Sequence, residues 1–210
     1  MTQRSVGMIK VAVFCASLLP CLWLVADGLA GRLGANPIET VSHRTGSWTL
    51  RFLLLTLAVT PLRRLLGWPW LIRLRRMIGL FAFFYAVLHF LTYLVLDQFF
   101  AWDEIAKDII KRPYITIGFA AFLLMWPLAI TSTNRMQRRL GRNWQRLHRL
   151  VYVVAVGGVL HYLWLVKADV REPVVYGLIL IALLAYRSLA THFAGFSQRS
   201  PMASSRNPTS

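Results

Sequence analysis

The sequence is poor in acidic residues and in cysteine. Its 210 residues include 8 Asp and Glu against 24 Lys and Arg, and its 2 cysteines, Cys15 and Cys21, both fall within one apolar segment. No disulfide framework is therefore indicated. The net charge of +16 does not indicate a nucleic-acid-binding protein, because the basic residues cluster between apolar segments rather than on one polar face.

The motifs of self-sufficient redox enzymes are also absent. No Gly-x-Gly-x-x-Gly motif follows a strand pattern, and no segment is long enough for a nicotinamide- or flavin-binding domain of about 100–150 residues. The sequence has no Ser/His/Asp set, no Cys/His spacing typical of zinc sites and no phosphate-binding loop. These absences argue against a reductase that carries its own nicotinamide domain.

Long apolar segments dominate what is present. The chain is 57% hydrophobic, with a mean hydropathy of +0.52, whereas soluble domains contain about 45–50% apolar residues. Six segments approach the roughly 17–25 residues that cross a bilayer: 8–26, 48–66, 77–96, 114–132, 147–166 and 173–189. The first lacks a convincing cleavage site, so we expect it to be retained. The sequence predicts an all-α integral membrane protein, a bundle of six transmembrane helices.

The charges predict the orientation of this bundle. Most Lys and Arg fall before the first segment and in every second connection, as expected for cytoplasmic loops. All eight acidic residues fall in the opposite loops: Asp27, Glu39, Asp97, Asp103, Glu104, Asp108, Asp169 and Glu172. We expect both termini in the cytoplasm, a membrane domain over 1–190 and a short polar cytoplasmic tail over 191–210.

His89 and His161 lie in the middle of apolar stretches, where an unpaired imidazole costs several kcal/mol. In the predicted topology their helices run in the same direction. His89 lies 12 residues beyond Met77 and His161 lies 14 beyond Leu147, about 18 and 21 Å along the two helices. Each alone could be a satisfied polar residue inside a bundle. Because the two share a depth in the outer half of the membrane, the pair predicts axial ligands of a haem iron.

His148 poses a separate question near the cytoplasmic end of the fifth segment. It precedes His161 by 13 residues, about 20 Å along a helix and about 140° away from it in direction. At that depth the third segment offers Arg75 and Arg76. Arginine is a poor iron ligand but suits phosphate or a haem propionate. A phosphorylated flavin, a quinone or a weakly ligated haem all remain open there, and so does a purely topological role for the arginines.

The two other histidines carry less information. His43 falls in the first predicted outer loop, where a surface histidine is the simpler interpretation, although it could contact an external partner. His192 falls in the predicted tail and is given no role.

Several long motifs resemble one family. They are Ile-Arg-Leu-Arg-Arg-Met-Ile-Gly-Leu at 72–80 followed by His89, Lys-Arg-Pro-Tyr-Ile-Thr-Ile-Gly at 111–118, Thr-Ser-Thr at 131–133, Trp-Gln-Arg-Leu-His-Arg-Leu-Val-Tyr at 144–152, and His-Tyr-Leu-Trp at 161–164. Together they resemble the haem-binding membrane subunit of bacterial periplasmic methionine-sulfoxide reductase systems, the MsrQ (formerly YedZ) family. The resemblance covers roughly residues 34–186.

This resemblance implies a six-helix, multi-pass protein of the bacterial inner membrane, within the ferric-reductase-like transmembrane superfamily. It implies haem b and FMN as cofactors, and passage of electrons from the quinone pool to a periplasmic molybdopterin subunit that reduces methionine sulfoxide in envelope proteins. By the same resemblance His89, His148 and His161 are associated with haem. In the superfamily the third helix often carries two histidines. Here Arg75 or Arg76 takes the inner position, which leaves open whether one haem or two is bound.

Two other functions stay open at this point. One is a stand-alone transmembrane ferric or metal reductase that receives electrons from a separate flavin reductase. The other is a haem-binding membrane anchor without redox turnover. Rapid reduction of ferric chelates without a partner would favour the first, and a haem that quinol or the partner cannot reduce and reoxidise would favour the second.

Overall fold

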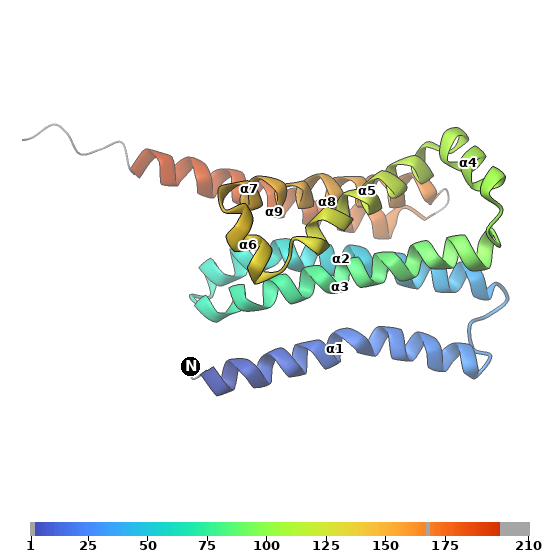
Figure 1. The fold of residues 1–210 in the computed structure, drawn as a ribbon, viewed down its shortest axis with the longest axis horizontal. Helices are drawn as coiled ribbons and strands as arrows, with labels where there is room; N and C mark the ends of the chain where they lie inside the picture. Colours follow the sequence, from blue (N-terminus) through green and yellow to red (C-terminus); the bar gives the residue numbers. More distant parts are fainter. Residues whose placement is uncertain (1–2, 167–168, 198–210) are drawn as a thin grey trace, which may run out of the picture.

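The structure is a computed structural model that describes residues 3–166 and 169–197, and it is helical throughout its main elements. Figure 1 shows three layers: α1 (Gln3–Leu29) alone, then α2 (Pro37–Leu65) with α3 (Ile72–Leu91), then α5 (Pro113–Ile130) with α8 (Leu150–Leu165) and α9 (Arg171–Ser197). Shorter elements connect them: η1 (Pro69–Leu71), the π-helical η2 (Thr92–Asp97), α4 (Trp102–Lys111), α6 (Asn134–Leu140) and α7 (Arg142–Leu147). The all-α prediction is confirmed.

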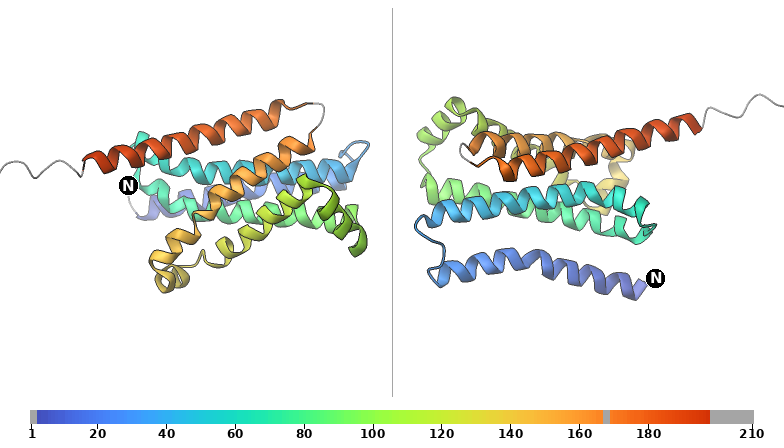
Figure 2. Two further views of the ribbon diagram at one scale, coloured as in Figure 1. Left: turned by 90° about the horizontal axis from the view of Figure 1, so that it is seen from above. Right: turned by 180° about the vertical axis from the view of Figure 1, so that it is seen from behind.

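The two ends of the bundle differ in their connections. The α4 end, called the outer end here after the predicted orientation, also holds the end of α1 and the start of α2. The inner end holds α6 and α7, together with the start of α1 and the end of α9, as the views of Figure 2 confirm. The ends of the described chain thus lie on one side of the bundle, while their cytoplasmic location stays a prediction.

Five helical segments are long and apolar enough to cross a membrane: Gln3–Leu29, Pro69–Asp97, Pro113–Ile130, Arg142–Leu165 and Arg171–Ala190. The predicted sixth span falls on α2, which contains Glu39 and four arginines. Since α2 is too polar along its length to qualify by composition, a six-span bundle stays a prediction. The five segments support a multi-pass membrane protein.

Helix α2 begins eleven residues before the predicted span at 48. Asn36 caps it by accepting the backbone N–H of Glu39 at 3.3 Å, and Pro37 occupies the first helical position. Both features stabilise a helix start, and Glu39 complements the helix dipole. The expectation that His43 lies in a loop was therefore wrong, because His43 belongs to the second turn of α2.

Helix α9 continues to Ser197, beyond the predicted boundary between residues 190 and 191. The sequence has no proline between Pro173 and Pro201, so nothing removes a helical N–H or forces the chain out of the helix before that point. The remainder of the predicted tail, 198–210, lies outside the described residues.

A polar clamp joins α1 to the middle layer. The hydroxyl of Tyr85 donates to the carbonyl of Ser17 at 2.8 Å and accepts the N–H of Cys21 at 3.1 Å, so it bridges two groups that a regular helix would pair with each other. At the outer end the buried Asp27 binds Arg44 at 2.6 Å and Arg32 at 3.1 Å. These contacts fix α1 although most of its surface is exposed.

Candidate cofactor site

A cavity of about 340 Å³ lies between α2, α3, α5 and α8, and α4 covers part of it. This volume is in the range of about 300–1,000 Å³ that cofactor and ligand sites occupy. Toward the inner end its walls are apolar, with Leu53, Phe122, Met125 and Val154 among them. Polar and charged side chains gather at its outer end: His43, Tyr93, Asp97, Arg112 and Tyr162. The site thus accepts a large apolar group with a polar edge.

His89 of α3 and His161 of α8 face each other across this cavity. Their ring centres lie 6.1 Å apart and the ring planes meet at 75°. Two metal–imidazole bonds of about 2 Å each put the coordinating nitrogens about 4 Å apart and the ring centres about 6 Å apart. The observed spacing therefore fits one metal atom between the two rings.

Backbone carbonyls orient both rings. Nδ1 of His89 lies 3.0 Å from the carbonyl oxygen of Ser42 on α2, and Nδ1 of His161 lies 2.7 Å from that of Tyr114 on α5. A carbonyl can only accept a hydrogen bond, so each Nδ1 carries the hydrogen and each Nε2 keeps its lone pair. Metal-binding histidines commonly donate their second nitrogen in this way. Both rings are thus prepared for coordination through Nε2.

Two helical glycines leave room for the rings. A Cβ atom at Gly118 would lie 2.6 Å from Nδ1 of His161, and one at Gly46 would lie 3.1 Å from Cε1 of His89. Glycine inside a helix costs up to about 1 kcal/mol relative to alanine. Here that cost is offset by the close approach of the imidazoles, which any other residue at position 118 would displace.

The chemistry of the pair points to a cofactor rather than a bare ion. Within residues 3–166 and 169–197 no group of three or more His, Cys, Asp or Glu side chains could hold a metal ion. Two histidines supply two ligands, which is what a metal already held in a ring of four nitrogens still requires. The residues present therefore fit haem, whose porphyrin would fill the apolar part of the cavity.

His148 lies outside this cavity, at the break between α7 and α8. Its Nε2 is 3.0 Å from Oγ1 of Thr131, and its ring stacks on Trp144 with centres 4.0 Å apart. The Thr131 hydroxyl already donates to the carbonyl of Pro127 at 2.6 Å, so it accepts the Nε2–H of His148. In this arrangement Nε2 of His148 is occupied by a hydrogen bond.

The two predicted arginines diverge at this inner end. Arg75 lies close enough to His148 and Arg187 for electrostatic interaction, and its side chain also contacts that of Tyr152. Arg76 instead donates a hydrogen bond to the side chain of Asn134 on α6. Neither arginine lines the large cavity. The structure thus brings Arg75 to His148 and His89 to His161, and it keeps the two pairs apart.

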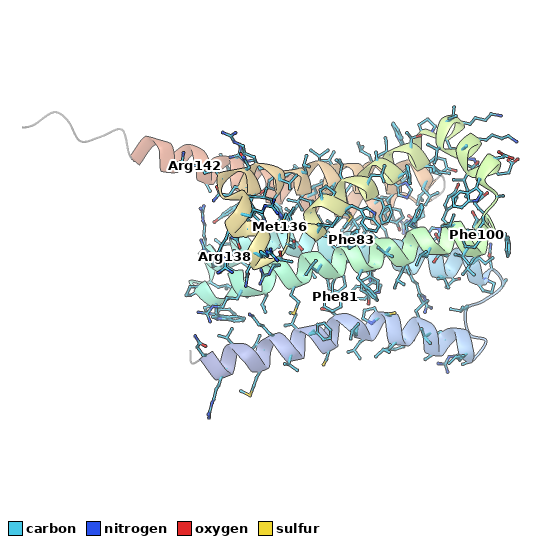
Figure 3. All side chains as sticks on the ribbon, viewed as in Figure 1. Phe81, Phe83, Phe100, Met136, Arg138 and Arg142 are labelled. Carbon is cyan, nitrogen blue, oxygen red and sulfur yellow. The ribbon has the colours of Figure 1, made fainter. Side chains whose placement is uncertain are left out.

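The side chains around His148 and Arg75, called the inner group from here on, are strongly basic. Figure 3 shows Arg138 of α6 and Arg142 of α7 at this end, with Phe100 at the opposite end. The hydroxyl of Tyr152 is buried there, beside the side chain of Arg75. No second matched pair of histidines forms in this region of the described chain, because His148 stands opposite Arg75.

Most of the chain is similar in sequence to known proteins of one family. Residues 45–159 match the family described as ferric reductase like transmembrane component. A protein-methionine-sulfoxide reductase heme-binding subunit MsrQ from Herminiimonas arsenicoxydans is 57% identical over 183 residues, covering 86% of this chain and 84% of that protein. The proteins of the same name from Azospira oryzae and Rhodospirillum rubrum are 55% and 57% identical, over 89% and 85% of this chain and 81% and 86% of their own lengths.

Proposed function

Because the chain belongs to the MsrQ family of haem-binding subunits, within the ferric-reductase-like transmembrane proteins, we propose that it is the membrane electron-transfer subunit of a protein-methionine-sulfoxide reductase system. In this role it takes electrons from the quinone pool of the bacterial inner membrane. It delivers them to a periplasmic molybdopterin-containing subunit, which repairs methionine sulfoxide in envelope proteins. The catalytic site lies on that partner.

The single observation that carries this proposal is the histidine pair. His89 and His161 lie 6.1 Å apart between ring centres, and each Nδ1 faces a backbone carbonyl that leaves its Nε2 free. Haem b bound there would accept and release one electron at a time. The chain's own residues hold the two rings at this spacing, exclude water with apolar side chains and so tune the potential.

The position of the pair supports the proposed direction of electron transfer. Both histidines belong to the outer part of their helices, close to the α4 end. An electron there has a short route to a protein that docks on the periplasmic side. Electrons enter near the inner end, where the group around His148 and Arg75 could hold FMN, a quinone or a second haem. The basic surface of α6 and α7 suits the cytoplasmic face.

The test is to extract and quantify haem and flavin in the purified full-length protein, then to follow the haem spectrum. We expect at least one low-spin haem per polypeptide, reduced by a quinol and reoxidised when the periplasmic partner and methionine sulfoxide are added. A haem that stays oxidised with quinol would contradict the proposal and favour a membrane anchor. Fast reoxidation by ferric chelates, with none by the partner, would favour a stand-alone metal reductase.

A further inference from the structure

The cavity around the histidine pair is asymmetric in charge, and this asymmetry limits how a haem can lie in it. Toward the inner end the walls are apolar, as described above, whereas the outer end carries the polar side chains. Arg112, the residue between α4 and α5, is the single Lys or Arg among the described residues that line the cavity. A haem has one edge with two carboxylates and an opposite edge that is apolar.

We propose that Arg112 binds the haem carboxylates, so that the carboxylate edge of the haem points to the outer end and the apolar edge points inward. This inference rests on the proposed haem between His89 and His161. The reverse orientation would bury two carboxylates among the side chains of Val154 and Met125, where unpaired charge is costly.

The contacts of Arg112 leave it able to bind a carboxylate. Its Nε donates to Oδ1 of Asp108 at 3.1 Å, which engages one of its five N–H groups. The Asp108 carboxylate also accepts the hydroxyl of Tyr93 at 3.3 Å, so the guanidinium is held in place from the α4 side. The side chain of Tyr114 takes a further hydrogen bond of the guanidinium, and the remaining N–H groups can still donate to a carboxylate.

The charges at the outer end of the cavity make Arg112 the main group that could balance the haem carboxylates. Asp97 also lines the cavity there, and its negative charge would repel the carboxylates of the haem. Contacts with Tyr114 and Asp108 raise the pKa of Arg112 above its usual value, so the guanidinium keeps its charge. Without this group the outer end would present Asp97 to the haem carboxylates with no permanent cation in the lining to balance it.

Three residues of the motif 111–118 would act together at the haem site. In the run 111–118, Arg112 faces the carboxylates, the carbonyl of Tyr114 accepts the Nδ1–H of His161, and Gly118 leaves space for that ring. All three lie within the first two turns of α5 or directly before it. The start of α5 therefore fixes both the axial ligand and the rotation of the haem about the iron.

The experiment compares two ligands and three variants. Full-length protein produced under haem limitation is titrated with protohaem and with its dimethyl ester, which has the same ring and iron but no carboxylate charge. The titration is repeated for Arg112→Gln, for Arg112→Lys, and for Lys111→Gln, which removes a neighbouring charge that does not line the cavity. The ratio of the two affinities cancels general effects of each substitution on the fold.

We expect the unmodified protein to bind protohaem about ten-fold or more tightly than the ester, the range expected for hydrogen bonds to a charged group. Arg112→Gln should lose this preference and keep its affinity for the ester. Arg112→Lys should keep part of the preference, and Lys111→Gln should keep all of it.

Equal affinities for the two ligands in the unmodified protein would overturn the orientation, as would an undiminished preference in Arg112→Gln. An equal loss in Lys111→Gln would also overturn it, because a general field would then replace the specific contact. These results differ from a failure of the proposed function. If no low-spin spectrum with two histidine ligands forms with either ligand, the histidine pair itself is not the haem site.

Discussion

The histidines at the two ends of the bundle differ in the use of Nε2. At the outer end His89 and His161 donate Nδ1–H to carbonyls, keep the lone pair on Nε2 and line a cavity. At the inner end His148 donates Nε2–H to Thr131 and stacks on Trp144. All three lie on or beside apolar helices, so burial alone does not separate them. A ring that forms its hydrogen bond through Nδ1 keeps Nε2 for a metal, whereas a ring that forms it through Nε2 is already satisfied.

The largest effect is expected from substitutions that remove one histidine of the outer pair. Replacing His89 or His161 with Ala removes one axial ligand, so the low-spin spectrum with two histidine ligands should disappear in either variant. Optical and electron paramagnetic resonance spectra of purified protein measure this, with haem quantified per polypeptide. An unchanged spectrum in both variants would refute the assignment.

A smaller but still large effect is expected from Gly118→Ala. The added Cβ would lie 2.6 Å from Nδ1 of His161, and forcing such a contact costs about 1–3 kcal/mol. Haem binding should weaken roughly ten-fold or more by titration, since 1.4 kcal/mol corresponds to a factor of ten.

The matched control for that variant is Gly79→Ala on α3. A Cβ at Gly79 would meet the side chain of Thr56 at 3.6 Å, an ordinary contact. This variant should bind haem as the unmodified protein does. Equal behaviour of the two variants would show that the close approach at Gly118 does not matter for the site.

Substitutions in the inner group should change the free energy of unfolding and leave haem binding at the outer site unchanged. Thr131→Val removes the acceptor of the His148 Nε2–H, which costs about 1 kcal/mol of unfolding free energy. Ser132→Ala is the control, because the Ser132 hydroxyl donates to Leu128 within its own helix. Thermal unfolding in detergent measures the difference, and a greater loss in Ser132→Ala would contradict the hydrogen-bond assignment.

The smallest effect is expected on the spectrum of the haem between His89 and His161 when His148 is replaced. His148→Ala should leave the low-spin signal of the outer haem intact, because His148 does not line that cavity. Loss of a second, distinct spectral component in this variant would show that the inner group also holds a haem. Loss of the outer signal would mean that the two ends are not independent.

Much of the fold could be predicted from hydropathy and spacing. The apolar segments marked the cores of α1, α3, α5, α8 and α9, and helical rise alone gave His89 and His161 a common depth. The early start of α2 could also have been found, because Asn36, Pro37 and Glu39 form a recognisable helix start. Reading that signal would have placed His43 on a helix.

The remainder of the site could not be predicted from side-chain types. Ser42 and Tyr114 act through backbone carbonyls, and a carbonyl is common to every residue. Gly46 and Gly118 matter because of what lies opposite them on other helices. The short helix α4 is too short and too polar to stand out as a span. These features depend on how helices pack, which one-dimensional periodicity does not contain.

The carbonyl contacts of the two histidines also bear on how the protein is assembled. His89 on α3 is oriented by its immediate neighbour α2, and His161 on α8 by its neighbour α5. Each helical hairpin-like pair therefore completes its own half of the site without the other. A haem bound between the two rings would join these two halves, and misfolding of either pair would remove one of its ligands. Each pair of helices would therefore have to fold before the proposed haem could bind with two histidine ligands.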